Sequence, residues 1–284
     1  MKILKYIIYS LVVILAASCS KDDSEPEIRH YTPNSDYKKR LEVPALTSGT
    51  EFIYHSTLVG GDSVMTYCLE YDTLKHHSRW VAFRFDGLTR SIDSNRMDPW
   101  ADDPSLSYKH WIGAGTFQGG VRGHICASHD RRYSQEANNQ TFYMTNMSPM
   151  QYDFNGDYWT KFESYVQDLG RSTSFADTLY IVKGGTIRDG QTNGTARSSA
   201  GKSVVIPKYY FIAMLKVHSG KYSAIGFWVE HKDYGRKGTM TDVSDAAMTI
   251  DKLEKNAGID FFPNLPDNIE TSVEASMSKS DWNL

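Results

Sequence analysis

The chain has 284 residues, of which 31 are basic and 34 acidic, and its formal net charge at pH 7 is −3. This balance excludes a generally basic protein that coats nucleic acid, so a polyanionic partner would have to be bound at a local basic site.

The first segment predicts export. Lys2 and Lys5 precede an apolar run over residues 6–15, and small residues 16–18 lead directly into Cys19. The run is shorter than the roughly 20 apolar residues of a spanning helix, and its order is that of a signal followed by a lipidation site. We therefore predict a cleaved signal peptide over 1–18 and a lipid on Cys19, which anchors the protein to a membrane.

Two alternatives exist for Cys19: a chance thiol beside an ordinary signal-peptidase site, or an uncleaved membrane anchor. Both place the body outside the cytoplasm. Residues 20–23, Ser-Lys-Asp-Asp, resemble the export tag of some Gram-negative surface lipoproteins. An outer-membrane lipoprotein is therefore expected, with cell-surface display favoured over the periplasmic face. Residues 19–40 are polar and proline-containing, and predict a flexible tether.

Residues 41–284 are expected to form one large domain, because no second linker or repeat divides them. Strand-like patterns occur at 51–58, 63–71, 79–85, 140–145, 178–183, 208–217 and 223–230, and helical patterns at 157–169, 244–256 and 268–275. This order predicts an α+β fold with a mostly antiparallel central sheet flanked by helices. The Gly- and Asp-rich segment 86–120 is expected to be a functional surface loop.

Cys68 and Cys126 remain as possible disulfide partners in an oxidising compartment. Two buried free thiols are the alternative, and the sequence does not decide between them.

The stretch 119–163 concentrates polar residues suited to phosphodiester chemistry, which needs a base, positive charge for phosphate oxygens and usually a metal. The residues are Arg122, His124, Asp130, Arg131, Arg132, Asn146, Asn155 and Glu163. His124 can accept a proton near neutral pH. Arg122 points to the same face of an extended segment as His124, and its guanidinium can donate two hydrogen bonds to one phosphate. An amide oxygen such as that of Asn155 suits magnesium, which keeps most of its waters.

Each of these residues also has an ordinary interpretation. His124 alone could be a core or surface histidine, and Arg122 a surface salt-bridge partner. Asn155 could cap a helix, a role for which Asp153 competes. Glu163 could lie on a solvated helix face.

The ordered set nevertheless resembles the DNA/RNA non-specific endonucleases of the ββα-metal fold. Residues 121–124, Val-Arg-Gly-His, stand where that family has Asp-Arg-Gly-His, and 146–149 match its Asn-x-Ser/Thr-Pro stretch. Asn155, Trp159 and Glu163 match its helix motif. Residues 79–83, 180–185, 205–210 and 258–266 resemble further family segments, so the resemblance spans nearly all of 41–282.

The resemblance implies hydrolysis of DNA and RNA with 5′-phosphate products, and it implies the roles of the residues. His124 would be the general base, Asn155 the direct ligand of Mg²⁺ or Mn²⁺, and Glu163 would orient metal-bound water. Asn146 would lie near the base and Arg122 near the phosphate.

Three departures affect the expected site. Val121 replaces the first Asp of the motif, and Met150 replaces the usual Gln after the Pro. The family's upstream arginine falls in segment 86–120, where Arg96 is the first choice and Arg90 the second. Because of Val121, a surface lipoprotein that only binds nucleic acid or another ligand remains the main alternative, and a glycan-binding or scaffold lipoprotein is a third.

Overall fold

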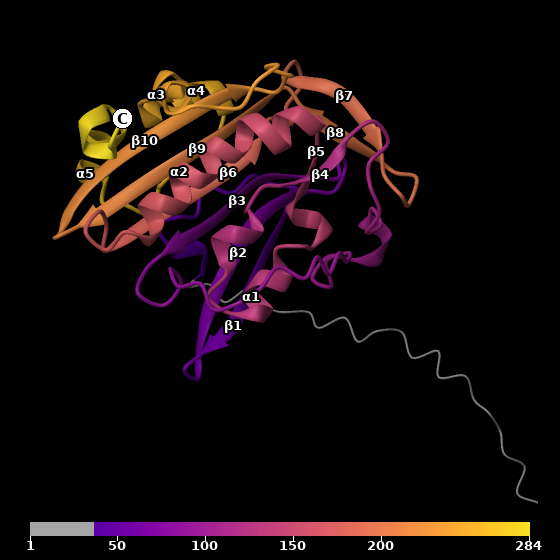
Figure 1. Ribbon diagram of the computed structural model, residues 1–284, viewed down its shortest axis with the longest axis horizontal. Helices are drawn as coiled ribbons and strands as arrows, with labels where there is room; N and C mark the ends of the chain where they lie inside the picture. The colour runs from indigo at the N-terminus through magenta and orange to yellow at the C-terminus, as the bar shows by residue number, and fades with distance from the viewer. Residues whose placement is uncertain (1–36) are drawn as a thin grey trace, which may run out of the picture.

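The computed structural model describes residues 37–284, so the predicted signal peptide, Cys19 and most of the tether lie outside the described residues. At its centre is a seven-stranded sheet of order β1-β2-β3-β6-β9-β10-β11 (Figure 1), in which every neighbouring pair is antiparallel. The strands are β1 (Glu51–Val59), β2 (Asp62–Asp72), β3 (His77–Phe85), β6 (Thr178–Gly185), β9 (Tyr209–His218), β10 (Lys221–Glu230) and β11 (Ala247–Met248). The predicted α+β class with a mostly antiparallel sheet is confirmed.

Strand β10 shows how side-chain alternation divides the core into two layers. Ile225 and Phe227 belong to one hydrophobic cluster, whereas Ala224 belongs to the other. Gly226 shares the face of Ala224, and an added Cβ there would lie 3.0 Å from the side chain of Leu253. The missing side chain therefore lets a helix approach this face closely.

Different elements cover the two faces of the sheet (Figure 1). On the first face, α2 (Thr160–Arg171) buries Phe162 and Val166 in the cluster that contains Phe227. On the second face, α4 (Ile250–Ala257) and α5 (Asp267–Glu274) contribute Leu253 and Val273 to the other cluster. The central sheet is thus a wall between two separate layers.

Smaller elements complete the described part of the chain. Two-stranded sheets are formed by β4 (Val121–His124) with β5 (Met147–Met150) and by β7 (Thr192–Arg197) with β8 (Ser203–Pro207). Short helices are α1 (Gln135–Gln140), α3 (Met240–Ala246), the π-helix η5 (Phe154–Trp159) and the 3-10 helices η1 (Tyr37–Lys39), η2 (Tyr108–His110), η3 (Ser128–Arg131), η4 (Met144–Asn146) and η6 (Lys279–Trp282). Within residues 37–284, no helix is long and apolar enough to cross a bilayer.

The strand predicted at 140–145 is wrong. This stretch contains the end of α1, a turn and the start of η4. Ser134 caps α1 by accepting a hydrogen bond from the Ala137 N–H, and Phe142 packs edge-on against Trp100 and His124. Phe142 is therefore fully buried behind these two side chains and does not belong to the sheet.

The helix predicted at 244–256 is two helices. Ala247 and Met248 leave the helical path and pair with Phe227 and Gly226 as β11. Thr249 then begins α4 by accepting a hydrogen bond from the Lys252 N–H. The sheet edge and the threonine cap together interrupt the helical pattern.

The other sequence expectations match observed elements to within a few residues, including the helical patterns at 157–169 and 268–275. At the amino-terminal side, the folded body extends to at least Tyr37. The Tyr37 ring lies 4.5 Å from that of Tyr54, and Asn264 donates hydrogen bonds to the carbonyls of Lys38 and Arg40.

Cys68 and Cys126 are both buried free thiols. They belong to different hydrophobic clusters, on opposite faces of the sheet. The disulfide alternative is therefore wrong, because the sheet lies between the two residues.

Candidate active site

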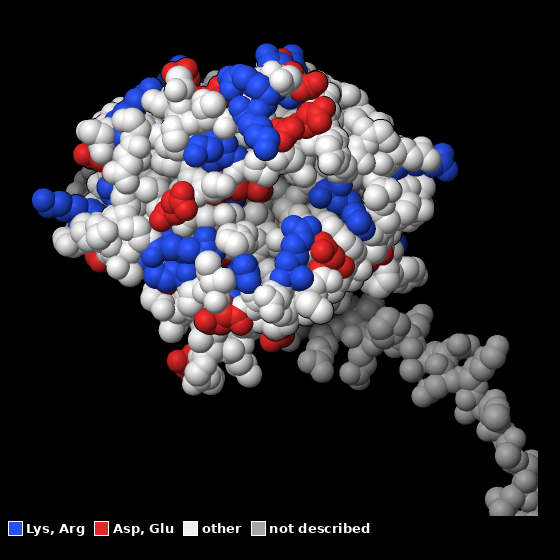
Figure 2. Space-filling model, in the orientation of Figure 1, with Lys and Arg blue, Asp and Glu red and all other residues white. Residues whose placement is uncertain are grey.

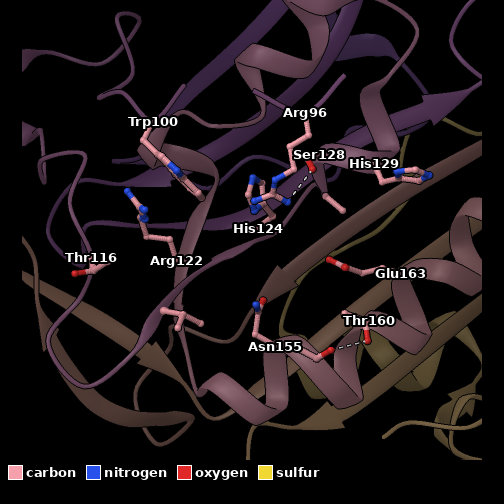
Figure 3. A pocket seen from close by; sticks show the side chains of 13 residues that line it. Arg96, Trp100, Thr116, Arg122, His124, Ser128, His129, Asn155, Thr160 and Glu163 are labelled. Carbon is pink, nitrogen blue, oxygen red and sulfur yellow. Dashed lines mark hydrogen bonds between the residues drawn. The ribbon is translucent and has the colours of Figure 1, made fainter. Parts of the chain in front are cut away.

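A pocket of about 380 Å³ opens on the first face, between β4, the η5–α2 helix and the segment 86–120. Five of the predicted site residues line it: Arg96, Arg122, His124, Asn155 and Glu163. Figure 3 shows two walls that face one another, with Arg96, His124 and Ser128 on one side and Asn155 and Glu163 on the other. Asn146 does not line the pocket.

The β4–β5 hairpin presents the predicted base. In its register Gly123 lies opposite Ser148 and His124 opposite Met147. An added Cβ at Gly123 would overlap the thioether of Met150. Glycine in the Arg-Gly-His motif therefore allows the two strands to pack, and Met150, the departure from the family pattern, fills that space.

His124 is held by aromatic contacts. Its ring centroid lies 4.9 Å from that of Phe142 and 5.3 Å from that of Trp100, and its Nε2 is buried with no hydrogen-bond partner. Burial, assisted by the nearby charge of Arg96, lowers the pKa of His124 to about 3. The imidazole is therefore neutral at pH 7, and its protonation needs negative charge close by.

Asn146 acts on this wall from inside the protein. It is fully buried, accepts the Cys126 N–H at 2.9 Å and donates to the carbonyls of Cys126 (2.9 Å) and Thr141 (2.7 Å). These bonds hold the chain just after His124 against the turn before η4. Asn146 therefore positions the base and does not contact the pocket.

Arg96, from the poorly patterned segment 86–120, reaches the pocket beside His124. Its guanidinium donates to Asp98 at 2.7 and 2.9 Å and to the Ser128 hydroxyl at 3.3 Å, and lies over the Phe142 ring at 5.1 Å. The hydrogen bond from Arg96 lowers the pKa of the Asp98 carboxyl. Arg90, the second choice, instead donates to Asp86, Ala176 and Asp177 carbonyls and does not line the pocket.

Arg122 lies near the other end of the same wall. Its guanidinium stacks 3.7 Å from the centroid of the Trp100 ring and donates to the Ala114 carbonyl. These two contacts fix the plane of the guanidinium. Val121, the residue that replaces the family's Asp, also lines the pocket and packs against the first hydrophobic cluster.

Asn155 lies within the π-helix η5, with its own N–H bonded to the Gln151 carbonyl at 3.0 Å. It is therefore not a helix cap, and Asp153, which precedes η5, makes no side-chain capping bond. Within the described chain the Asn155 amide makes no side-chain hydrogen bond, so its oxygen is available to a ligand. Single π turns are common at functional sites.

Glu163, on α2, faces the pocket beside Asn155 (Figure 3). Burial raises the pKa of the Glu163 carboxyl to about 7, with Asp130 adding to the rise and Lys183 and Arg96 opposing it. It is half-buried rather than on a solvated face.

The Asp130-Arg131-Arg132 run belongs mainly to the scaffold. Asp130 forms a fully buried 2.7 Å ion pair with Lys183 and accepts from Gln167 at 3.0 Å. Arg131 is fully buried, and Arg132 donates to the Ser94 carbonyl. The run therefore supplies no free phosphate-binding cations to the pocket.

Sequence reasoning missed five polar or aromatic lining residues: Trp100, Thr116, Ser128, His129 and Thr160. Trp100 stands in the segment 86–120, whose length marked it as functional without indicating which residues act. Ser128 and His129 follow the base by four and five positions in η3, and only the three-dimensional turn brings them back to the pocket.

Basic and acidic side chains alternate in small groups over this side of the molecule (Figure 2). This pattern matches the slightly negative net charge. The cationic groups of the pocket are therefore the individual arginines Arg96 and Arg122 and not part of a broad basic surface.

A family model of the DNA/RNA non-specific endonucleases matches residues 48–268, well over half of the chain. The chain belongs to this family. It is therefore a nucleic-acid hydrolase, and the resemblance drawn from the motifs is confirmed.

Relatives agree with this assignment. A nuclease from Nostoc sp. is 26% identical over 276 residues, covering 94% of this chain and 95% of the relative. Bovine mitochondrial endonuclease G is 25% identical, covering 70% and 68%. A crystal structure of an EndoG/EndoGI complex superposes with a TM-score of 0.60 at 19% identity, covering 76% of this chain and 89% of that chain, which supports the endonuclease fold.

Proposed function

We propose that this endonuclease hydrolyses phosphodiester bonds of both DNA and RNA in a metal-dependent reaction at the pocket around His124. The observation that carries the proposal is the convergence of a neutral imidazole, two arginines, an unpaired amide and a carboxyl group in one pocket of about 380 Å³. These groups come from separate segments of the chain.

The donor set on the helix wall fits a divalent metal. Asn155 would provide a neutral oxygen ligand, and Glu163 would hold metal-bound water. One protein ligand with several waters suits Mg²⁺, and Mn²⁺ is also compatible. The bound ion would supply positive charge for the leaving oxygen.

His124 would take the proton of the attacking water. It is neutral in the free protein because burial lowers its pKa. A phosphate bound between Arg96 and Arg122 brings negative charge close to the imidazole, which favours its protonated form. Substrate binding therefore strengthens the base when it is needed.

Arg96 and Arg122 would bind phosphate oxygens, since each guanidinium is held in a fixed orientation by an aromatic ring and offers directed N–H donors. Contacts to phosphate carry little base information. Cleavage of both nucleic acids with little sequence preference, giving 5′-phosphate products, is therefore expected.

The deciding assay incubates the mature protein with supercoiled plasmid and with RNA, in Mg²⁺, in Mn²⁺ and in excess chelator. Cleavage of both substrates that stops in chelator is expected, and end-labelling would identify the 5′ ends. Tight binding of both substrates without cleavage in any metal would instead support the alternative, a lipoprotein that binds nucleic acid through an inactive site, as Val121 allows.

We also propose that a lipid on Cys19 anchors the enzyme to the outer membrane, on the strength of the signal and tether sequence alone. Cell fractionation tests this: the wild-type protein should sediment with membranes, and Cys19→Ser should be released or fail to mature. A wild-type protein recovered without lipid in the soluble fraction would contradict the anchor, and protease accessibility on intact cells would separate surface from periplasmic display.

A further inference from the structure

The second face of the sheet, remote from the pocket, carries a compact group of acids. Asp251 and Glu254 lie three residues apart on α4, hence on one side of that helix, and Glu274 is the last residue of α5. One carboxylate oxygen from each lies within 4.8 Å of those of the other two. In residues 37–284 this is the only such group of three His, Cys, Asp or Glu side chains.

Within residues 37–284, no basic group balances these three carboxylates. Among the described residues, no Lys, Arg or His nitrogen forms an ion pair with any of them, whereas ten such pairs occur elsewhere. The charged groups that act on Glu274 are all acidic, namely Glu254, Glu270, Asp260 and Asp251. The local charge is therefore strongly negative.

Glu274 supplies a second, independent observation that points to a ligand at this position. It is only 7% exposed, and its Oε1 is buried with no hydrogen-bond partner. Glu254, by contrast, accepts the Phe261 N–H at 2.7 Å through Oε1. A buried carboxylate oxygen without a donor is unfavourable, and one carboxylate oxygen of Glu274 also lies within 4.8 Å of an oxygen of each of the other two acids.

We propose that Asp251, Glu254 and Glu274 bind a calcium ion that joins α4 to α5. The donors are all oxygen atoms, so the site should not prefer soft metals or metals that favour imidazole ligands. Ca²⁺ accepts six to eight oxygens in flexible geometry, including bidentate carboxylates, whereas Mg²⁺ requires a strict octahedron with few protein ligands. Asp251 is partly exposed, so waters can complete the coordination.

Protons compete with the ion at this calcium site. Burial, followed by the neighbouring acids, raises the pKa of Glu274 to about 8, and burial raises that of Glu254 to about 7. The surrounding acids Asp260 and Glu270 also have raised pKa values, chiefly through burial. Because carboxylates must be ionised to bind the ion, calcium binding should weaken as the solution is acidified.

The calcium site and the nuclease pocket are separable, because α4 and α5 pack in the second hydrophobic cluster and α2 in the first. The test uses the full-length protein in detergent, stripped with EDTA and dialysed free of the chelator. It is carried out in an Asn155→Ala background, which removes the proposed ligand of the pocket. Calcium binding is measured by titration calorimetry, and thermal unfolding is followed at pH 8.5 and 5.5.

One Ca²⁺ per chain is expected to bind and to raise the melting temperature at pH 8.5, with a smaller rise at pH 5.5. Adding Glu274→Gln should weaken calcium binding at least about tenfold, whereas Glu136→Gln, an exposed acid on α1, should leave it unchanged. Glu274→Gln should also fold, and without calcium at pH 8.5 it should melt above its parent, because a buried charge has been removed.

Two results would overturn the proposal. One is a protein that becomes more stable on acidification but shows no response to millimolar Ca²⁺, in which case protons alone neutralise the acids. The other is a Glu274→Gln variant that binds Ca²⁺ as tightly as its parent. Neither result depends on nuclease activity.

Discussion

The two faces of the central sheet hold acidic side chains in different electrostatic settings. On the first face, Glu163 lies near Lys183 and Arg96, which oppose the rise in its pKa. On the second, Glu274 is surrounded by acids alone. The raised pKa of Glu163 therefore results from burial in spite of nearby cations, whereas at Glu274 burial and like charge act together.

This difference indicates two kinds of site. The first face combines arginines, a neutral histidine and an amide, a mixture that can bind a phosphate and move a proton. The acidic group on the second face, Asp251, Glu254 and Glu274, offers only carboxylates, which suit the binding of a hard cation. Substitutions in the pocket should therefore alter catalysis, and substitutions in the acidic group should alter stability.

The largest effect is expected for His124→Ala, which removes the base but leaves Arg122 and Asn155 in place. The rate should fall by about 10²–10⁴-fold, while substrate affinity measured by fluorescence anisotropy is largely retained. His218→Ala, a half-buried histidine on β9 that does not line the pocket, serves as the control. A folded His124→Ala protein with a rate within about threefold of wild type would exclude the role, and raising the pH should not restore activity.

The second-largest effect is expected for Arg96→Ala. This variant should lose about 10²-fold in kcat/KM, because one directed donor to the phosphate is removed. Arg90→Ala is the matched control, since Arg90 comes from the same segment but donates to carbonyls outside the pocket. Equal losses in the two variants would show that segment 86–120 matters only for folding.

Asn155→Ala should lower activity and raise the Mg²⁺ concentration for half-maximal rate by at least about tenfold. Titrating the rate with Mg²⁺ measures both quantities. The control is Asn139→Ala, an amide on α1 away from the pocket. An unchanged metal requirement would remove Asn155 from the metal site, while calcium binding on the second face should be the same in both variants.

The smallest effect concerns stability in EDTA. The pKa of Glu163 is raised from its ordinary value to about 7, so the folded protein favours the protonated carboxyl group. The stability that this protonated group contributes is fully present below its ordinary pKa and is lost as the pH rises through 7. Glu163→Gln cannot ionise and should melt about 2–4 °C above wild type at pH 8.5, with no advantage at pH 4.5.

Asp168→Asn, an exposed acid on the same helix, should show neither effect on melting. Reduced nuclease activity of Glu163→Gln in Mg²⁺ is expected alongside its higher melting temperature. If Glu163→Gln is less stable than wild type at pH 8.5, the carboxylate is stabilised by its cations, and the contrast between the two faces is smaller than their surroundings imply.

Much of the fold could be predicted because strand and helix signals are local. Six of the seven predicted strands and the α2 helix follow from β-branched or aromatic runs and from helical periodicity. Segment 140–145 has the same composition as a strand, but Phe142 packs against Trp100 and His124. The composition of the segment indicates that such residues are buried, but it does not indicate against which elements they pack.

The candidate-site residues also fall into two groups, those that a local motif identifies and those that only the fold brings to the pocket. His124, Asn155 and Glu163 were identified because each stands at a fixed spacing within a short motif, and Arg96 was chosen only as one of two arginines in segment 86–120. Trp100, Ser128 and His129 carried no such pattern. They reach the pocket through the path of an irregular loop and of η3, which depends on contacts between residues far apart in the chain.

The sequence by itself determined the family, the sheet-rich α+β class and the chemical identity of the base and the amide, since these depend on residue type and local spacing. Only the tertiary structure decided that Asn146 positions the base from inside, that Arg96 rather than Arg90 enters the pocket, and that Cys68 and Cys126 are separated by the sheet. It alone brought Glu274 to Asp251 and Glu254. Burial and the distance between charges arise from long-range packing, which no local pattern encodes.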